Sequence, residues 1–165
     1  WAALVAGLNE LGRLAAAADM VMCYHHHMGT GVMTRAEVDR LMNEVDPEVV
    51  HLLLDTGHLY WAGDDPLALA RAYADRIRHV HLKDIRHDVM EACNARHLSF
   101  IESIMEGVFT VPGDGVIDFK PIFETLADAN YAGWLMVEAE QDAKKANPLD
   151  YARMARRYLR ETAGI

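Results

Sequence analysis

Short apolar runs alternate with stretches typical of helices along most of this 165-residue chain. A strand that pairs in parallel with the next strand needs a long crossover between them, which is usually a helix. Helical stretches of about ten residues, long enough for such crossovers, follow the apolar runs. The candidate strands cover residues 19–24, 49–54, 77–82 and 134–137. This alternation predicts an α/β fold with one parallel sheet, in which a first helix precedes four strand–helix units.

Several predicted helices begin at recognisable capping residues. Thr34 and Glu37 form the pattern of a capping box, which predicts a helix to about Glu44. Asp65 followed by Pro66 places an N-cap before a first-turn proline. The Pro-Gly-Asp-Gly segment at 112–115 is typical of a turn. Further helices are predicted over residues 4–18, 67–76, 98–106, 118–130 and 147–160.

Composition and charge limit the classes of protein to consider. A hydrophobic content of 52% in 165 residues is enough for a single domain, residues 1–165, with a sizeable core. No apolar run reaches the roughly 18 residues that span a membrane, and no secretory signal is recognisable. Cys23 and Cys93 match neither a disulfide framework nor a zinc knuckle, which favours a reducing, cytoplasmic location. The net charge of −9 repels phosphate backbones and disfavours nucleic acid as a partner.

Ionisable side chains stand at or just after the end of each predicted strand. In a parallel sheet the carboxyl ends of the strands lie at one edge, and in a βα barrel that edge carries the active site. A mixed set of imidazoles and carboxylates suits zinc, manganese, cobalt or iron, whereas calcium prefers oxygen ligands alone. We therefore predict a divalent-metal site at this edge. In strand order the candidates are His25 and His27; Asp55 and His58; His79, His81, Lys83 and Asp84; and Glu138 and Glu140.

Three consecutive histidines end the first strand. Because side chains alternate along a strand, His25 and His27 should share one face and His26 the other. A single histidine near a strand end is more often structural than functional, and the glycine turn at 113–115 is only a weak candidate for phosphate binding. Cys23 and the methionines are expected in the core. The histidines interpreted as structural are His51, His87 and His97.

Five segments together closely resemble the dehydratases of inositol catabolism in the xylose-isomerase-like TIM-barrel superfamily of sugar isomerases and epimerases. They are YHHHMGTGV, LLLDTGHLYWAG, HVHLKDIR, GVFTVPGDGVIDF and GWLMVEAEQD. The resemblance implies a (β/α)8 barrel of which this chain is the C-terminal half, strands 5–8. Such barrels need roughly 250 residues, and the chain begins with Trp1 inside a predicted helix. We therefore expect a fragment of a longer barrel; a homo-oligomer in which half-barrels rebuild a full ring is the alternative.

The resemblance also implies one divalent metal held by a residue from each of the four strands. Carried onto this sequence, the ligands are His25, Asp55, His81 and Glu138. The sugar epimerases usually have a glutamate at the first of these positions, so His27 is a rival for His25. Mn²⁺ or Co²⁺ is the expected metal, with Zn²⁺ as the alternative.

The implied reaction is that of a hydro-lyase, which removes water from 2-keto-myo-inositol (scyllo-inosose) to give a trihydroxycyclohexane-1,2-dione. A base must take the proton beside the carbonyl, and an acid must protonate the departing hydroxide. Glu138 is the expected base, and His27 and His58 are candidates for the acid because an imidazole titrates near working pH. Lys83 is expected to stabilise negative charge on an oxygen.

The expected partner is a small polyhydroxylated keto-inositol or sugar. Its predicted contacts are His58, Arg86, Trp61 and Glu140, although the spacing of Arg86 differs from that in relatives and Trp61 is equally compatible with packing. Three rival functions stay open. They are a metal-dependent sugar isomerase or epimerase on the same fold, a DNA-repair nuclease, which the negative charge disfavours, and a sugar-binding module without a metal.

Overall fold

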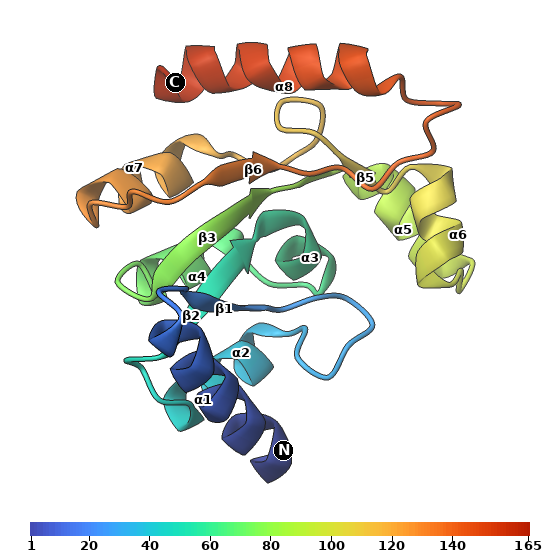
Figure 1. Ribbon diagram of the computed structural model, residues 1–165. Helices are drawn as coiled ribbons and strands as arrows, with labels where there is room; N and C mark the ends of the chain where they lie inside the picture. The colour runs from blue at the N-terminus through green and yellow to red at the C-terminus, as the bar shows by residue number, and fades with distance from the viewer.

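Four parallel strands form the central sheet of the computed structural model, which describes residues 1–165. They are β1 (Met22–His25), β2 (Val50–Asp55), β3 (Ile77–Leu82) and β6 (Leu135–Val137). Their order in the sheet, β1-β2-β3-β6, is their order along the chain (Figure 1). The predicted α/β fold with a parallel sheet is confirmed.

The helices largely follow the predicted ones. They are α1 (Ala2–Ala17), α2 (Arg35–Glu44), α3 (Thr56–Trp61), α4 (Pro66–Ala72), α5 (His87–Ala95), α6 (Phe100–Glu106), α7 (Lys120–Asp128) and α8 (Pro148–Ala163). The capping box of Thr34 and Glu37 is present, and Asp65 caps α4. The helix α1 lies at the end of the sheet that β1 forms, and α8 lies beyond the end that β6 forms (Figure 1). None of these helices is long and apolar enough to cross a membrane.

Alternation along the strands separates a core face from a polar face. On β3, Val80 and Leu82 are fully buried and share a core with residues of the helices. His81, between them, lies on the other face and is partly exposed. Asp55 is opposite His81 in the β2–β3 register. The parallel pairing therefore brings a carboxylate and an imidazole from two strands to the same level of the sheet.

Two local features differ from the predictions. Helix α3 begins directly at the end of β2, because the carboxylate of Asp55 accepts the backbone N–H of His58 and caps the helix. Helix α4 ends at Ala72, four residues earlier than predicted. Arg76 is instead drawn toward β2, where its carbonyl accepts the N–H of Leu52 and its guanidinium donates to the carbonyl of Val50.

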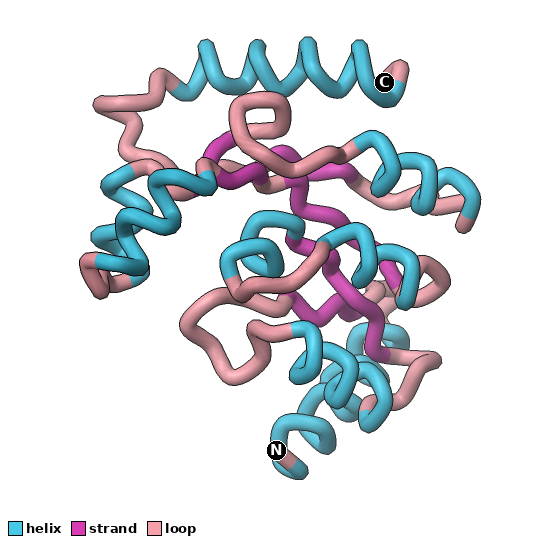
Figure 2. Tube along the Cα trace, turned by 180° about the vertical axis from the view of Figure 1, so that it is seen from behind, coloured by secondary structure: helices cyan, strands magenta, loops and turns pink.

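A small antiparallel sheet follows β3 and was not predicted. It pairs β4 (Asp84–Ile85) with β5 (Phe109–Thr110), and the segment between them contains α5 and α6. Figure 2 shows from behind that α5 and α6 lie beside each other, to one side of the parallel sheet. The region from Asp84 to Ile117, including the glycine turn, is called the insertion below.

Asp84 organises the turn of the insertion. Its carboxylate is fully buried and accepts four backbone N–H groups, from Ile85, Gly113, Gly115 and Ile117, at 2.8–3.2 Å. Gly115 approaches this carboxylate so closely that a side chain there would collide with it. The backbone N–H groups of Gly113 and Gly115 already donate hydrogen bonds to Asp84 and are not available to a phosphate. The structure therefore does not support phosphate binding at this turn.

Candidate metal centre and substrate site

The three consecutive histidines have three different environments. The Nε2 atom of His25 lies 3.2 Å from Oδ2 of Asp55. His26 points the other way, is fully buried, and its Nε2 accepts the N–H of Asp55 at 3.3 Å. Burial lowers the pKa of His26 to about 4, so its ring is a neutral structural acceptor. The ring of His27 packs against that of His58, with 3.6 Å between ring centroids.

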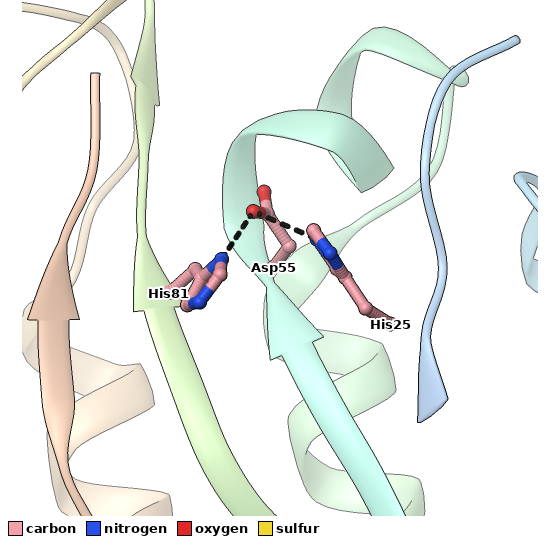
Figure 3. Close-up of side chains that lie close together, drawn as sticks. All are labelled: His25, Asp55 and His81. Atoms are coloured by element: carbon pink, nitrogen blue, oxygen red, sulfur yellow. Dashed lines mark hydrogen bonds and ion pairs between the residues drawn. The ribbon is translucent and has the colours of Figure 1, made fainter. Parts of the chain in front are cut away.

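The first donor set consists of His25, Asp55 and His81. One ligand atom of each lies within 4.8 Å of those of the other two. The Oδ2 atom of Asp55 is the centre of the set, 3.2 Å from Nε2 of His25 and 3.3 Å from Nδ1 of His81. Figure 3 shows the three side chains converging from the ends of three adjacent strands. The predicted edge of the sheet thus brings these three predicted ligands together.

Glu138 adjoins the first donor set through His81. It follows the short strand β6, and its Oε2 lies 2.8 Å from Nδ1 of His81 and 3.2 Å from Nζ of Lys83. It is outside the group whose ligand atoms are all mutually close. The fourth predicted ligand is therefore beside the other three and touches one of them.

The contact between His81 and Glu138 fits a cation site. Although their atoms are 2.8 Å apart, neither Nδ1 of His81 nor Oε2 of Glu138 has a hydrogen-bond partner of acceptable geometry. Contacts from Asp55 and Glu138 raise the pKa of His81 to about 9, and the contact with His81 lowers the pKa of Glu138 to about 2. The set thus attracts positive charge, and its atoms converge without satisfying one another, as ligands of a shared ion do.

The charge of Asp55 is held by its neighbours. Burial alone would raise its pKa, since a carboxylate loses hydration there. The contacts from His25 and His81 and the charge of Lys83 outweigh burial and hold the pKa of Asp55 well below its usual range. A fully buried carboxylate is therefore ionised at the centre of the set.

A second donor set lies beside the first. His27, His58 and Glu140 also place one ligand atom each within 4.8 Å of the others. The ammonium group of Lys83 contacts two of its members, at 2.8 Å from Nε2 of His58 and 2.9 Å from Oε2 of Glu140. The other ring nitrogen of His58, Nδ1, accepts the backbone N–H of Met28 at 3.4 Å.

The structure does not support the acid role expected of His58. Burial and the nearby charge of Lys83 lower its pKa to about 2, although Asp55 acts in the opposite direction. This low pKa does not favour His58 as the acid, and its role in proton transfer stays a prediction. Lys83 behaves in the reverse way: burial opposes its charge, but Asp55, Glu140 and Glu138 together raise its pKa.

Arg86 lies in the insertion and holds it together. Its guanidinium donates to the carbonyls of Gly107 and Phe109, to Oγ1 of Thr110, to Oδ2 of Asp114 and to the hydroxyl of Tyr151. These five contacts assign Arg86 a structural role. The predicted contact with a substrate stays a prediction.

Trp61 belongs to an aromatic cluster beside the second donor set. Its ring stacks on Phe100 at 5.6 Å between centroids, and its Nε1 donates to Asn94. Phe100 in turn lies 5.3 Å from His27, and Phe109 lies 4.9 Å from His58. Packing accounts for Trp61 as the structure shows it.

Sequence reasoning did not select Phe100 or Phe109, which flank His27 and His58. Both lie in the insertion, Phe100 as the first residue of α6 and Phe109 in β5, and only the tertiary contact places them near the strand ends. The sequence signal available was an aromatic residue near the start of the predicted short helix and another shortly after its end. Thr56 was also missed; its hydroxyl donates to the carbonyl of Lys83 and accepts the N–H of the same residue.

Comparison with known proteins places this geometry in context. The sequence model of the family described as "Xylose isomerase-like TIM barrel" matches residues 1–162. An inosose dehydratase of Clostridium tetani and one of Geobacillus thermodenitrificans are each 56% identical to this chain over all of its 165 residues. The chain covers 55% of each of these proteins, so it spans about half the length of the curated relatives it matches.

Solved structures share the fold. The IOLI protein, solved with a bound zinc atom, matches with a TM-score of 0.70 and 19% identity over 96% of this chain and 54% of its own. A D-psicose 3-epimerase, solved in the presence of D-fructose, matches with a TM-score of 0.69 and 19% identity over 98% of this chain and 55% of its own. At these identities the likeness concerns the fold alone.

Proposed function

Because the chain belongs to the xylose isomerase-like TIM-barrel family, we propose that its strand ends form the metal centre of an inosose dehydratase. The observation that carries the proposal is the convergence of His25, Asp55 and His81 within 4.8 Å, with Glu138 against His81. The choice of reaction is supported by the 56% identity to proteins of that name. The substrate of the proposed reaction is 2-keto-myo-inositol, and the product is a trihydroxycyclohexane-1,2-dione.

We place the four strands as strands 5–8 of an eight-stranded barrel. The sheet order β1-β2-β3-β6 is sequential and parallel, as in one arc of such a barrel. Both outer strands of the arc, β1 and β6, have one unpaired edge in the sheet. Exposed apolar residues occur close to both edges, Val21 before β1 and Trp134 before β6. These features support a barrel that continues beyond the residues described.

His25, Asp55, His81 and Glu138 are the residues that would hold the metal. The geometry favours His25 over His27 as the first ligand, because His27 belongs to the second donor set. Two imidazoles and two carboxylates suit Mn²⁺, Co²⁺ or Zn²⁺. A bound divalent ion supplies electrostatic stabilisation for negative charge that develops on the carbonyl oxygen of the substrate.

Glu138 is proposed as the base. The low pKa of Glu138 keeps it ionised, and its side chain is 37% exposed and therefore accessible to a substrate. It would take the proton from the carbon beside the carbonyl, and the hydroxyl on the next carbon would leave with a proton from an acid. One C–H bond and one C–O bond break, a C=C bond forms, and one water is lost.

His27 is the remaining candidate for the acid. Its ring is partly exposed beside His58, and its Nδ1 lies 2.7 Å from the carbonyl of Met28, which leaves Nε2 free to face a substrate. Lys83 supplies a fixed positive charge next to Glu138 and Glu140. Glu140 is proposed to bind a hydroxyl of the substrate from its position between Lys83 and His58. A cytoplasmic location stays a prediction.

Product analysis tests the reaction itself. We expect the metal-loaded protein that carries this chain to convert 2-keto-myo-inositol with a rise in near-ultraviolet absorbance, because loss of water forms a conjugated enol-dione. An epimerase or isomerase would begin with the same proton removal but would not raise this absorbance. A change of substrate stereochemistry without loss of water would replace the dehydratase proposal by that rival.

A pair of variants separates metal binding from proton transfer. His25→Ala should lower metal affinity by about 100-fold or more, because it removes a ligand. His27→Ala should keep the metal and lower turnover by about 10²–10⁴-fold, because it removes the acid. His97→Asn, which changes an exposed histidine outside both donor sets, is the control and should alter neither. Loss of metal in His27→Ala, with none in His25→Ala, would reverse the assignment of the first ligand.

A further inference from the structure

The two donor sets have nearly the same chemistry but different centres. Each combines two imidazoles and one carboxylate with ligand atoms within 4.8 Å of one another. A carboxylate oxygen of Asp55 lies at the centre of the first set. In the second set the ammonium of Lys83 lies 2.8 Å from Nε2 of His58 and donates a hydrogen bond to Oε2 of Glu140 at 2.9 Å. Two of the three members of the second set therefore already contact a cation.

Lys83 is held in this position by every residue of the Asp-Thr-Gly-His segment. Thr56 binds its backbone N–H and carbonyl through one hydroxyl. A side chain at Gly57 would meet the aliphatic part of Lys83 at 2.7 Å, so this glycine makes room for it. Nε2 of His58 lies 2.8 Å from the ammonium, and Oδ2 of Asp55 lies 3.6 Å from it. The ammonium also lies 4.7 Å from the ring centroid of Phe109.

The charges also balance with one metal and one ammonium. Three carboxylates, Asp55, Glu138 and Glu140, lie within 3.6 Å of Nζ of Lys83. One divalent ion and one ammonium together offset their three negative charges. Without the ammonium, one divalent ion would leave a negative charge beside two imidazoles, which is an environment that binds a second divalent ion.

We propose that Lys83 is a built-in cation that limits the site to one metal ion by occupying the second donor set. When Lys83 is replaced by an uncharged or shorter residue, His27, His58 and Glu140 become free to bind a second divalent ion next to the first. This inference rests on the proposed metal centre at the first set. It assigns Lys83 a positioning role that is distinct from contact with the substrate.

Metal stoichiometry tests the inference without reference to activity. The purified protein that carries this chain is stripped with chelator, titrated with Mn²⁺ alone, and analysed for ions per chain. We expect about one ion for the unchanged protein and about two for Lys83→Ala. Lys83→Gln keeps the length of the side chain and removes its charge, and it should also bind about two ions; it serves where Lys83→Ala does not fold, as judged by circular dichroism.

A double variant shows where the second ion binds. Lys83→Ala combined with Glu140→Gln removes the carboxylate of the second set and should return the protein to about one ion per chain. Two-metal sites place their ions about 3.5–4 Å apart. The electron paramagnetic resonance spectrum of Mn²⁺ should therefore show coupled ions in Lys83→Ala, and isolated ions in the unchanged protein and in the double variant.

The outcomes distinguish this inference from the proposed function. One ion in the unchanged protein and one ion in folded Lys83→Ala and Lys83→Gln would overturn the role of Lys83 and leave the metal centre intact. Two ions in the unchanged protein would also overturn it, because the ammonium would then exclude nothing. No bound ion in any of these proteins would overturn the metal centre, and the inference with it.

Discussion

Asp55 and Asp84 are both fully buried aspartates, Asp55 at the end of β2 and Asp84 two residues after the adjacent strand β3, yet their surroundings differ in kind. Asp84, in the insertion, accepts hydrogen bonds from four backbone amides. Asp55 uses one oxygen to cap α3, and its other oxygen faces only side chains, those of His25, His81 and Lys83. A buried carboxylate thus fixes a loop in one place and gathers titratable groups in the other.

The hydrogen-bond partners of the two regions distinguish a structural polar cluster from a candidate binding site in this molecule. In the insertion, two charged groups have full sets of partners: Asp84 has four amides, and the guanidinium of Arg86 has five acceptors. At the strand ends, Nδ1 of His81 and Oε2 of Glu138 lie close together without a hydrogen bond. Buried polar atoms are normally satisfied, so convergent atoms that lack partners indicate a site for something else.

The largest expected effect comes from Asp55→Asn. The substitution removes the negative charge at the centre of the first donor set and should lower Mn²⁺ affinity by about 100-fold or more. Titration with Mn²⁺ measures it. The same substitution at Asp84 is the matched control, and there the affinity should not change. Unchanged Mn²⁺ affinity in Asp55→Asn would show that Asp55 differs from Asp84 in its neighbours but not in a role as a metal ligand.

Asp84→Asn should instead lower stability. An amide keeps one acceptor oxygen, so about half of the four hydrogen bonds are lost, and their buried donors are left facing an NH₂ group. We expect the free energy of unfolding to fall by about 2–3 kcal/mol, measured by urea denaturation with saturating metal. If Asp84→Asn were as stable as the unchanged protein, the carboxylate would not be what holds the glycine turn.

Arg86→Lys should have the smallest effect and also sharpens the comparison. Lysine keeps the charge but replaces a planar fork with a single ammonium, so some of the five contacts are lost. We expect a loss of about 1–2 kcal/mol in unfolding free energy, with turnover of 2-keto-myo-inositol unchanged. A fall in turnover at unchanged stability would instead support the predicted contact of Arg86 with the substrate.

The outlines of the fold and the grouping of the candidate metal ligands were predictable from sequence for a local reason. Strand residues alternate, and parallel strands end at one edge, so His25, Asp55 and His81 could be placed together from the positions of three apolar runs. The opposite orientation of His26 followed from the same rule. The insertion was less predictable, because β4 and β5 are two-residue strands that pair Asp84 with Thr110 and Ile85 with Phe109, far apart along the chain.

The roles of individual ionisable groups depended on contacts between distant segments. The low pKa of His58 results from burial and from Lys83, which follows a different strand. Arg86 is engaged by Gly107, Phe109 and Tyr151, which lie far along the chain. A sequence pattern shows that a residue can carry a charge or donate a proton, but not which neighbours will set its pKa or use its hydrogen bonds.

By itself, the sequence determined the parallel sheet, the edge at which its polar residues meet and the kinds of ligand atom available there. These properties depend on periodicity and residue type, which are local. Only the tertiary structure decided that His25 joins Asp55, that His27 joins His58 and that Lys83 lies between the two sets. Those outcomes depend on distances of a few ångströms between strands, and packing alone sets such distances.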